Sequence, residues 1–290
     1  MSRAPAAHMR HAPRAGPAGM RRALPAGWAD RRGTLHAEWT KLRTVAGPAW
    51  LLAATAAATV AVSAGAAAGT RCPAGIACPV DTTKLSLTGI EFGQAIVAIL
   101  AVLAISSEYS TGMIRTTLTA TPRRSAVLAA KAALVSGLVL VAGTIAVGGS
   151  LLAGRLILPG NGFTASRGFA PLSLAHGPTL RAAAGSVLYL ALIALLSLGV
   201  ATAVRDSAVA VGTVLGLLYV FPIVAASMAG DPRWQHRIEA YTPMNAGLTI
   251  QATTGLHGLP ISPWEGLGVL AGWAAAALIA GGLLLRLRDA

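Results

Sequence analysis

Charged residues are scarce in this sequence. Asp, Glu, Lys and Arg make up 11% of the 290 residues, whereas 54% are hydrophobic. In a soluble globular domain about 25% of the residues are charged. The shortage of charge favours a protein that lies in a membrane, and a soluble helical protein is the weaker alternative.

Catalytic and metal-binding motifs are also missing. The chain has no G-x-x-x-x-G-K-[ST] loop for nucleotide phosphates, no H-E-x-x-H and no G-x-S-x-G. Its six histidines are scattered over tails and connections, and its two cysteines have no neighbouring ligands for a closed zinc site. We therefore expect no enzyme active site and no cofactor bound by this chain.

Long apolar runs are what the sequence has in abundance. A helix that crosses a bilayer needs about 20 mostly apolar residues, and six runs meet this requirement. They predict an all-α polytopic membrane domain over residues 48–286, with spans at 48–69, 87–106, 132–157, 181–204, 208–229 and 265–285. Three glycine pairs spaced four residues apart indicate close helix packing: Gly65/Gly69, Gly212/Gly216 and Gly268/Gly272.

The distribution of basic residues predicts the orientation of these spans. An even number of spans places both termini on one side of the membrane. Lys and Arg are in excess on that side, mainly before the first span and between the second and third spans. The positive-inside rule therefore predicts a plasma-membrane protein with both termini in the cytoplasm. Because the net charge of +13 is carried by such tails and connections, we do not expect nucleic acid as a partner.

The chain before the first span has two parts. Residues 1–27 mix Arg, Ala, Pro and Gly without apolar periodicity, which predicts a disordered basic tail or a leader that precedes a true start at Met20. Residues 28–46 carry apolar positions on one helical face, which predicts an amphipathic helix in the cytoplasmic interface with membrane lipid. The alternative, a straight extension of the first span, is disfavoured by the helix-breaking pair Gly47-Pro48. The candidate residues of the interfacial helix are Glu38, Trp39, Lys41, Leu42 and Arg43.

Two outer connections have unusual composition. Cys72 and Cys78, the only cysteines, lie between the first and second spans, where an oxidising exterior permits a disulfide; free thiols are the open alternative. Residues 230–264 are rich in aromatic and apolar side chains. We expect short helices there that hold these rings at the outer headgroup level.

Glu91 is the one acidic residue well inside an apolar run. A charge in the bilayer costs a few kcal/mol or more, so a proton or ion site is one interpretation. Glu91 is also only one turn from the expected outer end of its span, where it can reach water or a neighbouring helix. A structural role is therefore the favoured interpretation, and an ion-coupled carrier that uses Glu91 is the alternative.

The connection between the second and third spans is longer than a turn requires. Residues 108–120 can form a short cytoplasmic helix on which Glu108 and Arg115 lie near one face, with Ile114 and Leu118 offering apolar contact. The alternative is a solvated turn attracted to anionic lipid. The mixed surface favours a site that docks another protein, and Thr121-Pro122 predicts the start of the next helix.

Two stretches resemble a known family. "EWTKLRTV" before the first span and "SEYSTGMIRTTLTATPRRSAVLAAK" after the second resemble the membrane-spanning permease subunits of type-2 ABC exporters, particularly those of actinobacteria. The layout is similar from about Glu38 to the C-terminus. The second stretch carries most of the resemblance, through Glu108, Tyr109, Gly112, Arg115, Thr116, Leu118, Pro122, Arg123 and Arg124, closed by Lys131.

The resemblance implies a six-span half-transporter that pairs with a second permease subunit, the same or different. It implies that a separate cytoplasmic ABC ATPase, which carries the ATP and Mg²⁺, binds a coupling helix between spans 2 and 3. It also implies that Glu38, Lys41 and Arg43 support this contact. A hydrophobic or amphipathic substrate, such as a drug, lipid-like molecule or peptide, is expected from the few polar groups. The alternatives are a non-transporting sensor or immunity protein and the carrier that uses Glu91.

Overall fold

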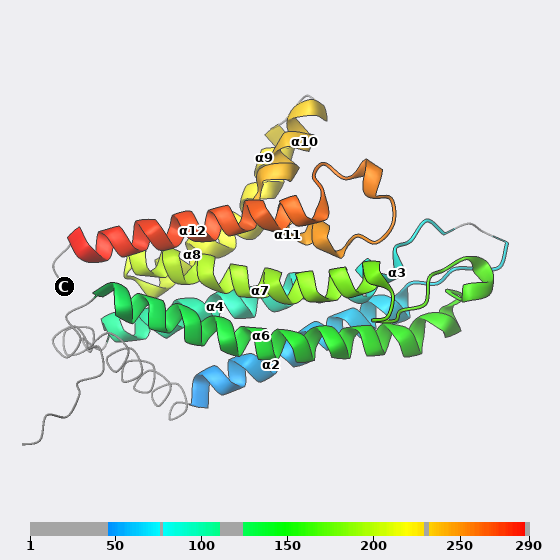
Figure 1. The fold of residues 1–290 in the computed structure, drawn as a ribbon, viewed down its shortest axis with the longest axis horizontal. Coiled ribbons are helices and arrows are strands. Elements are labelled where there is room, and N and C mark those ends of the chain that lie inside the picture. The colour runs from blue at the N-terminus through cyan, green and yellow to red at the C-terminus, as the bar shows by residue number, and fades with distance from the viewer. Residues whose placement is uncertain (1–45, 76–77, 111–123, 229–231, 288–290) are drawn as a thin grey trace, which may run out of the picture.

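The computed structural model describes residues 46–75, 78–110, 124–228 and 232–287, and these residues form a bundle of helices without a strand (Figure 1). Among them, five helical segments are long and apolar enough to cross a membrane. They are α2 (Ala46–Gly69), α6 (Arg124–Ile157), α7 (Gly177–Val204), the segment that begins with α8 (Ser207–Leu215), and α12 (Pro263–Leu287). The predicted all-helical, membrane-type class is confirmed for the described residues.

The remaining predicted span corresponds to α4 (Ile90–Ser110), whose apolar part, Ile90–Ser106, is shorter than the other five. The helix boundaries also differ from the apolar runs. α6 begins at Arg124, two turns before the apolar run 132–157 and close to the helix start predicted at Thr121-Pro122, and α2 begins at Ala46 and includes Gly47 and Pro48 in its first turn. A proline is tolerated there because the first amides of a helix have no partner within it. Apolar runs mark the part of a helix that suits lipid, and the helix itself extends beyond them.

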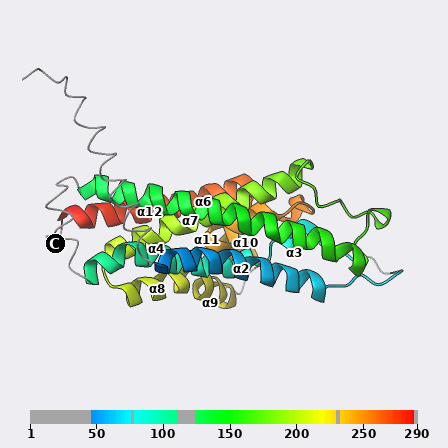
Figure 2. The ribbon, with the colours of Figure 1, turned by 90° about the horizontal axis from the view of Figure 1, so that it is seen from below.

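α7 is the central helix of the bundle. It lies among and packs against α4, α6, α8 and α12 (Figure 2). It is also the most buried of the membrane-type helices. Its buried residues lie on all its faces and include Tyr189, Leu190, Ile193 and Leu198. α2 lies on the other side of α4 and α6 and packs against both. The arrangement makes α7 the element through which the helices on the two sides are connected.

The closest helix contacts occur at glycines other than the predicted pairs. A Cβ added to Gly199 in α7 would meet the backbone of Ala277 in α12 at 2.5 Å, and one added to Gly281 would meet the Gly199 carbonyl at 2.6 Å. At all six glycines of the predicted pairs, an added Cβ meets nothing within 4 Å. The prediction from four-residue spacing was therefore wrong, because glycine is so abundant here that the spacing arises on outward faces too.

The fifth membrane-type segment is irregular. α8 passes into a π-helical turn, Gly216–Val220, and then into α9 (Phe221–Met228). Pro222 lies two residues after the end of this turn and has no amide hydrogen to donate, which explains why the regular α-helical hydrogen bonding is interrupted just before it. α9 leads to α10 (Pro232–Tyr241), and both project from the side of the bundle in Figure 1.

Short helices form the connections at the end of the bundle where α2 finishes. They are α3 (Thr82–Ser86), the 3₁₀ turns Leu158–Asn161 and Ala165–Arg167, and, before α12, α11 (Pro243–Leu248) with the 3₁₀ turns Thr249–Gln251 and Leu256–Gly258. Trp234, Tyr241 and Trp264 in the connection between α9 and α12 are all more than half exposed. Short helices with exposed aromatic rings are what the sequence predicted for this connection.

Candidate functional site

The two helices that border the predicted docking segment in sequence meet at the opposite end of the bundle. α4 ends at Ser110 and α6 begins at Arg124 at the same end, where α12 also finishes and α7 turns into α8 (Figure 1). Glu108 and Tyr109 are in the last turn of α4, and Arg124 is the first residue of α6. The other predicted contact residues lie outside the described residues: Gly112, Arg115, Thr116, Leu118, Pro122 and Arg123, and Glu38, Trp39, Lys41, Leu42 and Arg43 of the interfacial helix.

Lys131 joins the two helices that border this segment. It lies two turns into α6, is only 5% exposed, and its Nζ donates a hydrogen bond of 3.1 Å to the backbone carbonyl of Ala104 in α4. A buried ammonium is costly unless it is hydrogen bonded, and an acceptor near the end of the neighbouring helix meets that need. The contact holds the end of α4 and the beginning of α6 together.

α6 is the longest helix described, with 34 residues, and it has no proline. At 1.5 Å per residue it is about 51 Å long, longer than the hydrocarbon core of about 30 Å. It runs from the docking segment to the opposite end, where Asn161, in the turn that follows it, donates from Nδ2 to the carbonyl of Ala67 at 2.8 Å. A displacement at its start would therefore be carried to the far end of the bundle.

A polar cluster lies inside the bundle between α4, α7 and the π-helical turn. Gln94 and Tyr189 are both fully buried, and the Tyr189 hydroxyl donates to Oε1 of Gln94. The Nε2 of Gln94 has no hydrogen-bond partner among the described residues. The pair therefore fixes α4 against α7, and the described residues leave the Nε2 donor of Gln94 unused.

Glu91 belongs to the same region, one turn before Gln94. The hydroxyl of Tyr219, in the π-helical turn, donates to the backbone carbonyl of Glu91. The Glu91 side chain itself is half-buried and makes no hydrogen bond with the described residues. The backbone carbonyl of Glu91, and not its side chain, therefore bonds to the π-helical turn, and the carboxylate stays accessible.

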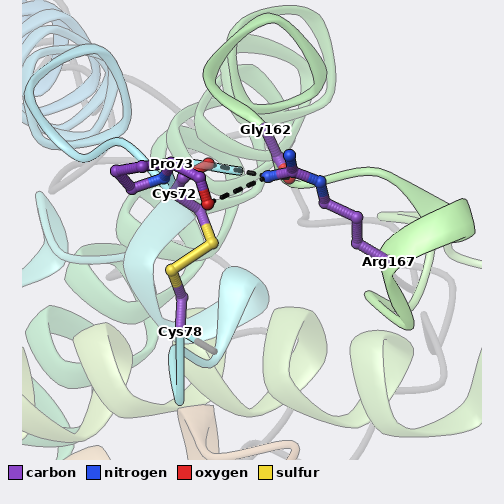
Figure 3. The surroundings of a disulfide bond; sticks show 5 residues. All are labelled: Cys72, Pro73, Cys78, Gly162 and Arg167. Carbon is purple, nitrogen blue, oxygen red and sulfur yellow. Dashed lines mark hydrogen bonds between the residues drawn. A yellow bond between two sulfur atoms is a disulfide. The ribbon is translucent and has the colours of Figure 1, made fainter. Parts of the chain in front are cut away.

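Cys72 and Cys78 form a disulfide that closes the connection between α2 and α3, with their Cα atoms 6.0 Å apart. Arg167 points its guanidinium at this connection and donates from Nη1 to the carbonyl of Cys72 at 2.8 Å (Figure 3). The Cys72 amide donates in turn to the carbonyl of Asn161 at 2.9 Å. The disulfide connection is therefore held against the segment that follows α6.

Asp81 joins this connection to the one before α12. Its Oδ1 accepts from the amides of Thr83 and Lys84, both at 3.1 Å, which caps the N-terminus of α3. Its carboxylate also accepts from the amide and hydroxyl of Thr253 and from the amide of Thr254, at 3.0 Å for the last. Burial raises the pKa of this carboxyl, but the bonds from Thr253, Lys84 and Thr254 outweigh burial and leave the pKa below its ordinary value.

Several of these residues were missed by reasoning from the sequence. Three of them, Gln94, Tyr189 and Tyr219, lie inside predicted apolar runs. A single hydroxyl or amide does not interrupt such a run, so nothing in the sequence marked them as partners. Asp81 stands next to the cysteine loop and gives no signal of its partner, which is 172 residues away in sequence. Their pairing depends on helix packing.

Comparison with known proteins adds no assignment. No protein-family model matches this sequence, and no curated protein matches it. No group of three or more His, Cys, Asp and Glu side chains gathers in the described ranges.

Proposed function

We propose that this protein is the membrane-spanning permease subunit of an ATP-driven ABC exporter. In this proposal six helices cross the membrane, a separate cytoplasmic ATPase binds the segment between α4 and α6, and a hydrophobic or amphipathic substrate moves out of the cell. The observation that carries the proposal is that the family-like docking stretch lies between two packed helices of an apolar bundle.

α6 supports this function mechanically. Its first residue, Arg124, belongs to the family-like stretch, and its last turn is followed by Asn161, which is bonded to the end of α2. Because Lys131 joins α6 to α4, a force on the docking segment acts on both helices together. A partner that closes on ATP would then shift a rigid 34-residue helix against the central helix α7.

α4 completes the six spans of this proposal and is the second of them along the chain. Its apolar part, Ile90–Ser106, is about 25 Å long and packs against α2, α7 and α8 within the bundle. Three turn residues and α3 precede it, and the polar last turn follows it. An apolar helix of this length, buried among longer ones, spans most of a hydrocarbon core of about 30 Å.

The two ends of the bundle support a cytoplasmic location for the docking segment. A disulfide persists in an oxidising compartment, so the Cys72–Cys78 end faces outward. The opposite end carries Arg124, Arg205 and Arg286, in accord with the positive-inside rule. The proposal therefore places the protein in a bacterial plasma membrane with both termini inside, paired with a second permease subunit.

The test is a double substitution, Glu108→Ala with Arg115→Ala, in the full-length chain expressed together with the ATPase encoded nearest to it. We expect the variant to reach the membrane but to lose co-purification of the ATPase and substrate-stimulated ATP hydrolysis. The matched control, Lys84→Ala with Glu239→Ala, removes one base and one acid from exposed positions on the other face. Full ATPase stoichiometry with normal stimulation in the Glu108/Arg115 variant would defeat the proposal.

Glu91 gives the second candidate function, an ion-coupled carrier, because its carboxylate is half-buried without a hydrogen bond from the described residues. Glu91→Gln separates the two candidates. The main-chain bond to Tyr219 survives this substitution, so an ATP-driven exporter keeps most of its transport activity. A carrier that moves a proton on Glu91 loses transport, which is measured as substrate efflux from cells or vesicles.

A further inference from the structure

A cavity of about 900 Å³ lies between α6 and α7, in the half of the bundle toward the disulfide end. Its α6 wall follows one helical face through Thr144, Gly148 and Leu152, and its α7 wall contains Leu180, Ala184 and Leu188. The three leucines are 58%, 52% and 44% exposed, so the cavity opens on the side of the bundle. It is therefore a groove that lipid would reach directly.

The groove has the dimensions of one bilayer leaflet. From Thr144 to Arg155 the α6 wall rises about 16 Å at 1.5 Å per residue, and half of a hydrocarbon core is about 15 Å. Ligand pockets range from about 300 to 1,000 Å³, so this groove is at the upper end. Thr144 closes the deep end, where its hydroxyl is satisfied by the Leu140 carbonyl at 2.7 Å. The deep part is consequently apolar.

Polarity increases toward the outer rim. Arg155 is exposed there and makes no hydrogen bond or ion pair with the described residues. Thr179, in the first turn of α7, is 3% exposed and its hydroxyl makes no hydrogen bond within the same ranges. No side-chain hydrogen bond from its N-cap residue, His176, caps the N-terminus of α7. The Arg155 guanidinium and the Thr179 hydroxyl can both donate to an anion at this rim.

We propose that this groove binds an anionic phospholipid of the outer leaflet, with its acyl chains between α6 and α7 and its phosphate at Arg155. A cation above a leaflet-deep apolar groove complements an amphiphile with an anionic head. A second copy of this bundle would present a broad helix face, which fills a narrow concave groove poorly. The proposal needs the chain to lie in a bilayer but does not need an ATPase, so it stands or falls separately from the exporter proposal.

The glycines of α6 allow a test by filling the groove. A Cβ added to Gly148 meets nothing within 4 Å, and Gly148 lines the groove, so Gly148→Leu directs a large side chain into the groove. Gly137→Leu is the matched control, because Gly137 is on the same helix, is equally open and does not line the groove. For the rim, Arg155→Gln removes the cation, and Lys84→Gln removes an exposed cation that does not line the groove.

The measurement is the amount of lipid retained by the purified full-length chain, determined by native mass spectrometry after exposure to phosphatidylglycerol or phosphatidylcholine in mixed micelles. We expect preferential retention of phosphatidylglycerol, lost with Gly148→Leu and about tenfold weaker with Arg155→Gln, the loss of one charge-assisted contact. Gly137→Leu and Lys84→Gln should retain lipid as the unsubstituted chain does.

Three outcomes would overturn the proposal. Equal retention of the two lipids by the unsubstituted chain would remove the role of Arg155. Equal phosphatidylglycerol retention by Gly148→Leu and Gly137→Leu would place the lipid elsewhere. Efficient self-cross-linking of a Leu152→Cys variant in membranes would show that a second copy covers the groove. Should Gly148→Leu fail to fold, the comparison of Arg155→Gln with Arg155→Lys, which keeps the charge, decides the question instead.

Discussion

Replacing Asp81 tests how the connections at the disulfide end are held together. Asp81→Ala removes the cap of α3 and leaves the amides of Thr253 and Thr254 without their acceptor. Loss of an N-cap costs about 1 kcal/mol, and a hydrogen bond to a charged group contributes about 1.5–3 kcal/mol. Because the carboxylate is partly exposed and water replaces some of these bonds, we use the low end of this energy range for the hydrogen bonds from Thr253 and Thr254. The expected loss of stability is about 2–3 kcal/mol.

Asp206→Ala is the matched control. Asp206 also caps a helix, α8, through its Oδ1 and the amide of Val209 at 2.8 Å, but among the described residues it makes no bond to a distant connection. Its replacement should cost about 1 kcal/mol. The difference between the two variants isolates the contribution of the bonds from Thr253 and Thr254.

The assay combines thermal unfolding in detergent with hydrogen exchange of peptides that cover residues 249–255. Asp81→Ala should lower the midpoint more than Asp206→Ala and should speed exchange at Thr253 and Thr254. The lowered pKa of Asp81 adds a pH signature: its contribution is complete above the unfolded pKa of about 3.9 and disappears as the pH falls through the lower folded value. Unchanged exchange at these two amides in Asp81→Ala would refute the assigned link.

Two further predictions concern the bundle itself. Gly199→Ala should destabilise the protein by about 1–3 kcal/mol, because the new Cβ would meet the Ala277 backbone at 2.5 Å. Gly212→Ala is the control and should be neutral or slightly stabilising, because a Cβ there meets nothing within 4 Å. Thermal unfolding compares the two variants, and equal midpoints would contradict the α7–α12 contact. Tyr189→Phe leaves Oε1 of buried Gln94 without its donor and should cost about 1–3 kcal/mol, while Tyr241→Phe, at an exposed position, should not change the midpoint.

Apolar runs predicted most of the helices because lipid-compatible length and composition leave a strong signal in sequence. The same signal is silent on where a helix ends in polar residues, so the first two turns of α6, from Arg124, were not assigned to the span. It is also silent on which glycines meet another helix. Gly199 and Gly281 contact each other's helices because α7 and α12 cross there, and nothing in their spacing distinguishes them from outward-facing glycines.

The buried contacts were beyond prediction for a similar reason. The bond from Tyr189 to Gln94 and the bonds from Thr253 to Asp81 join segments that are distant in sequence, so they exist only once the helices are packed. The disulfide was an open alternative because two cysteines six residues apart permit it without requiring it. The docking segment, in contrast, was proposed from its own residues, and its central part lies outside the described residues.

α6 connects the proposals physically. Its first residues belong to the docking stretch, its outer half forms one wall of the groove, and the turn after it is bonded to the disulfide connection. The other wall of the groove is α7, the helix against which a displaced α6 would slide. Such a movement of α6 would change the width of the groove, and a lipid that fits one width better would favour the corresponding position. Since a ligand shifts an equilibrium by its difference in affinity between states, we expect phosphatidylglycerol to alter the ATPase rate of the assembled complex and Gly148→Leu to abolish that effect.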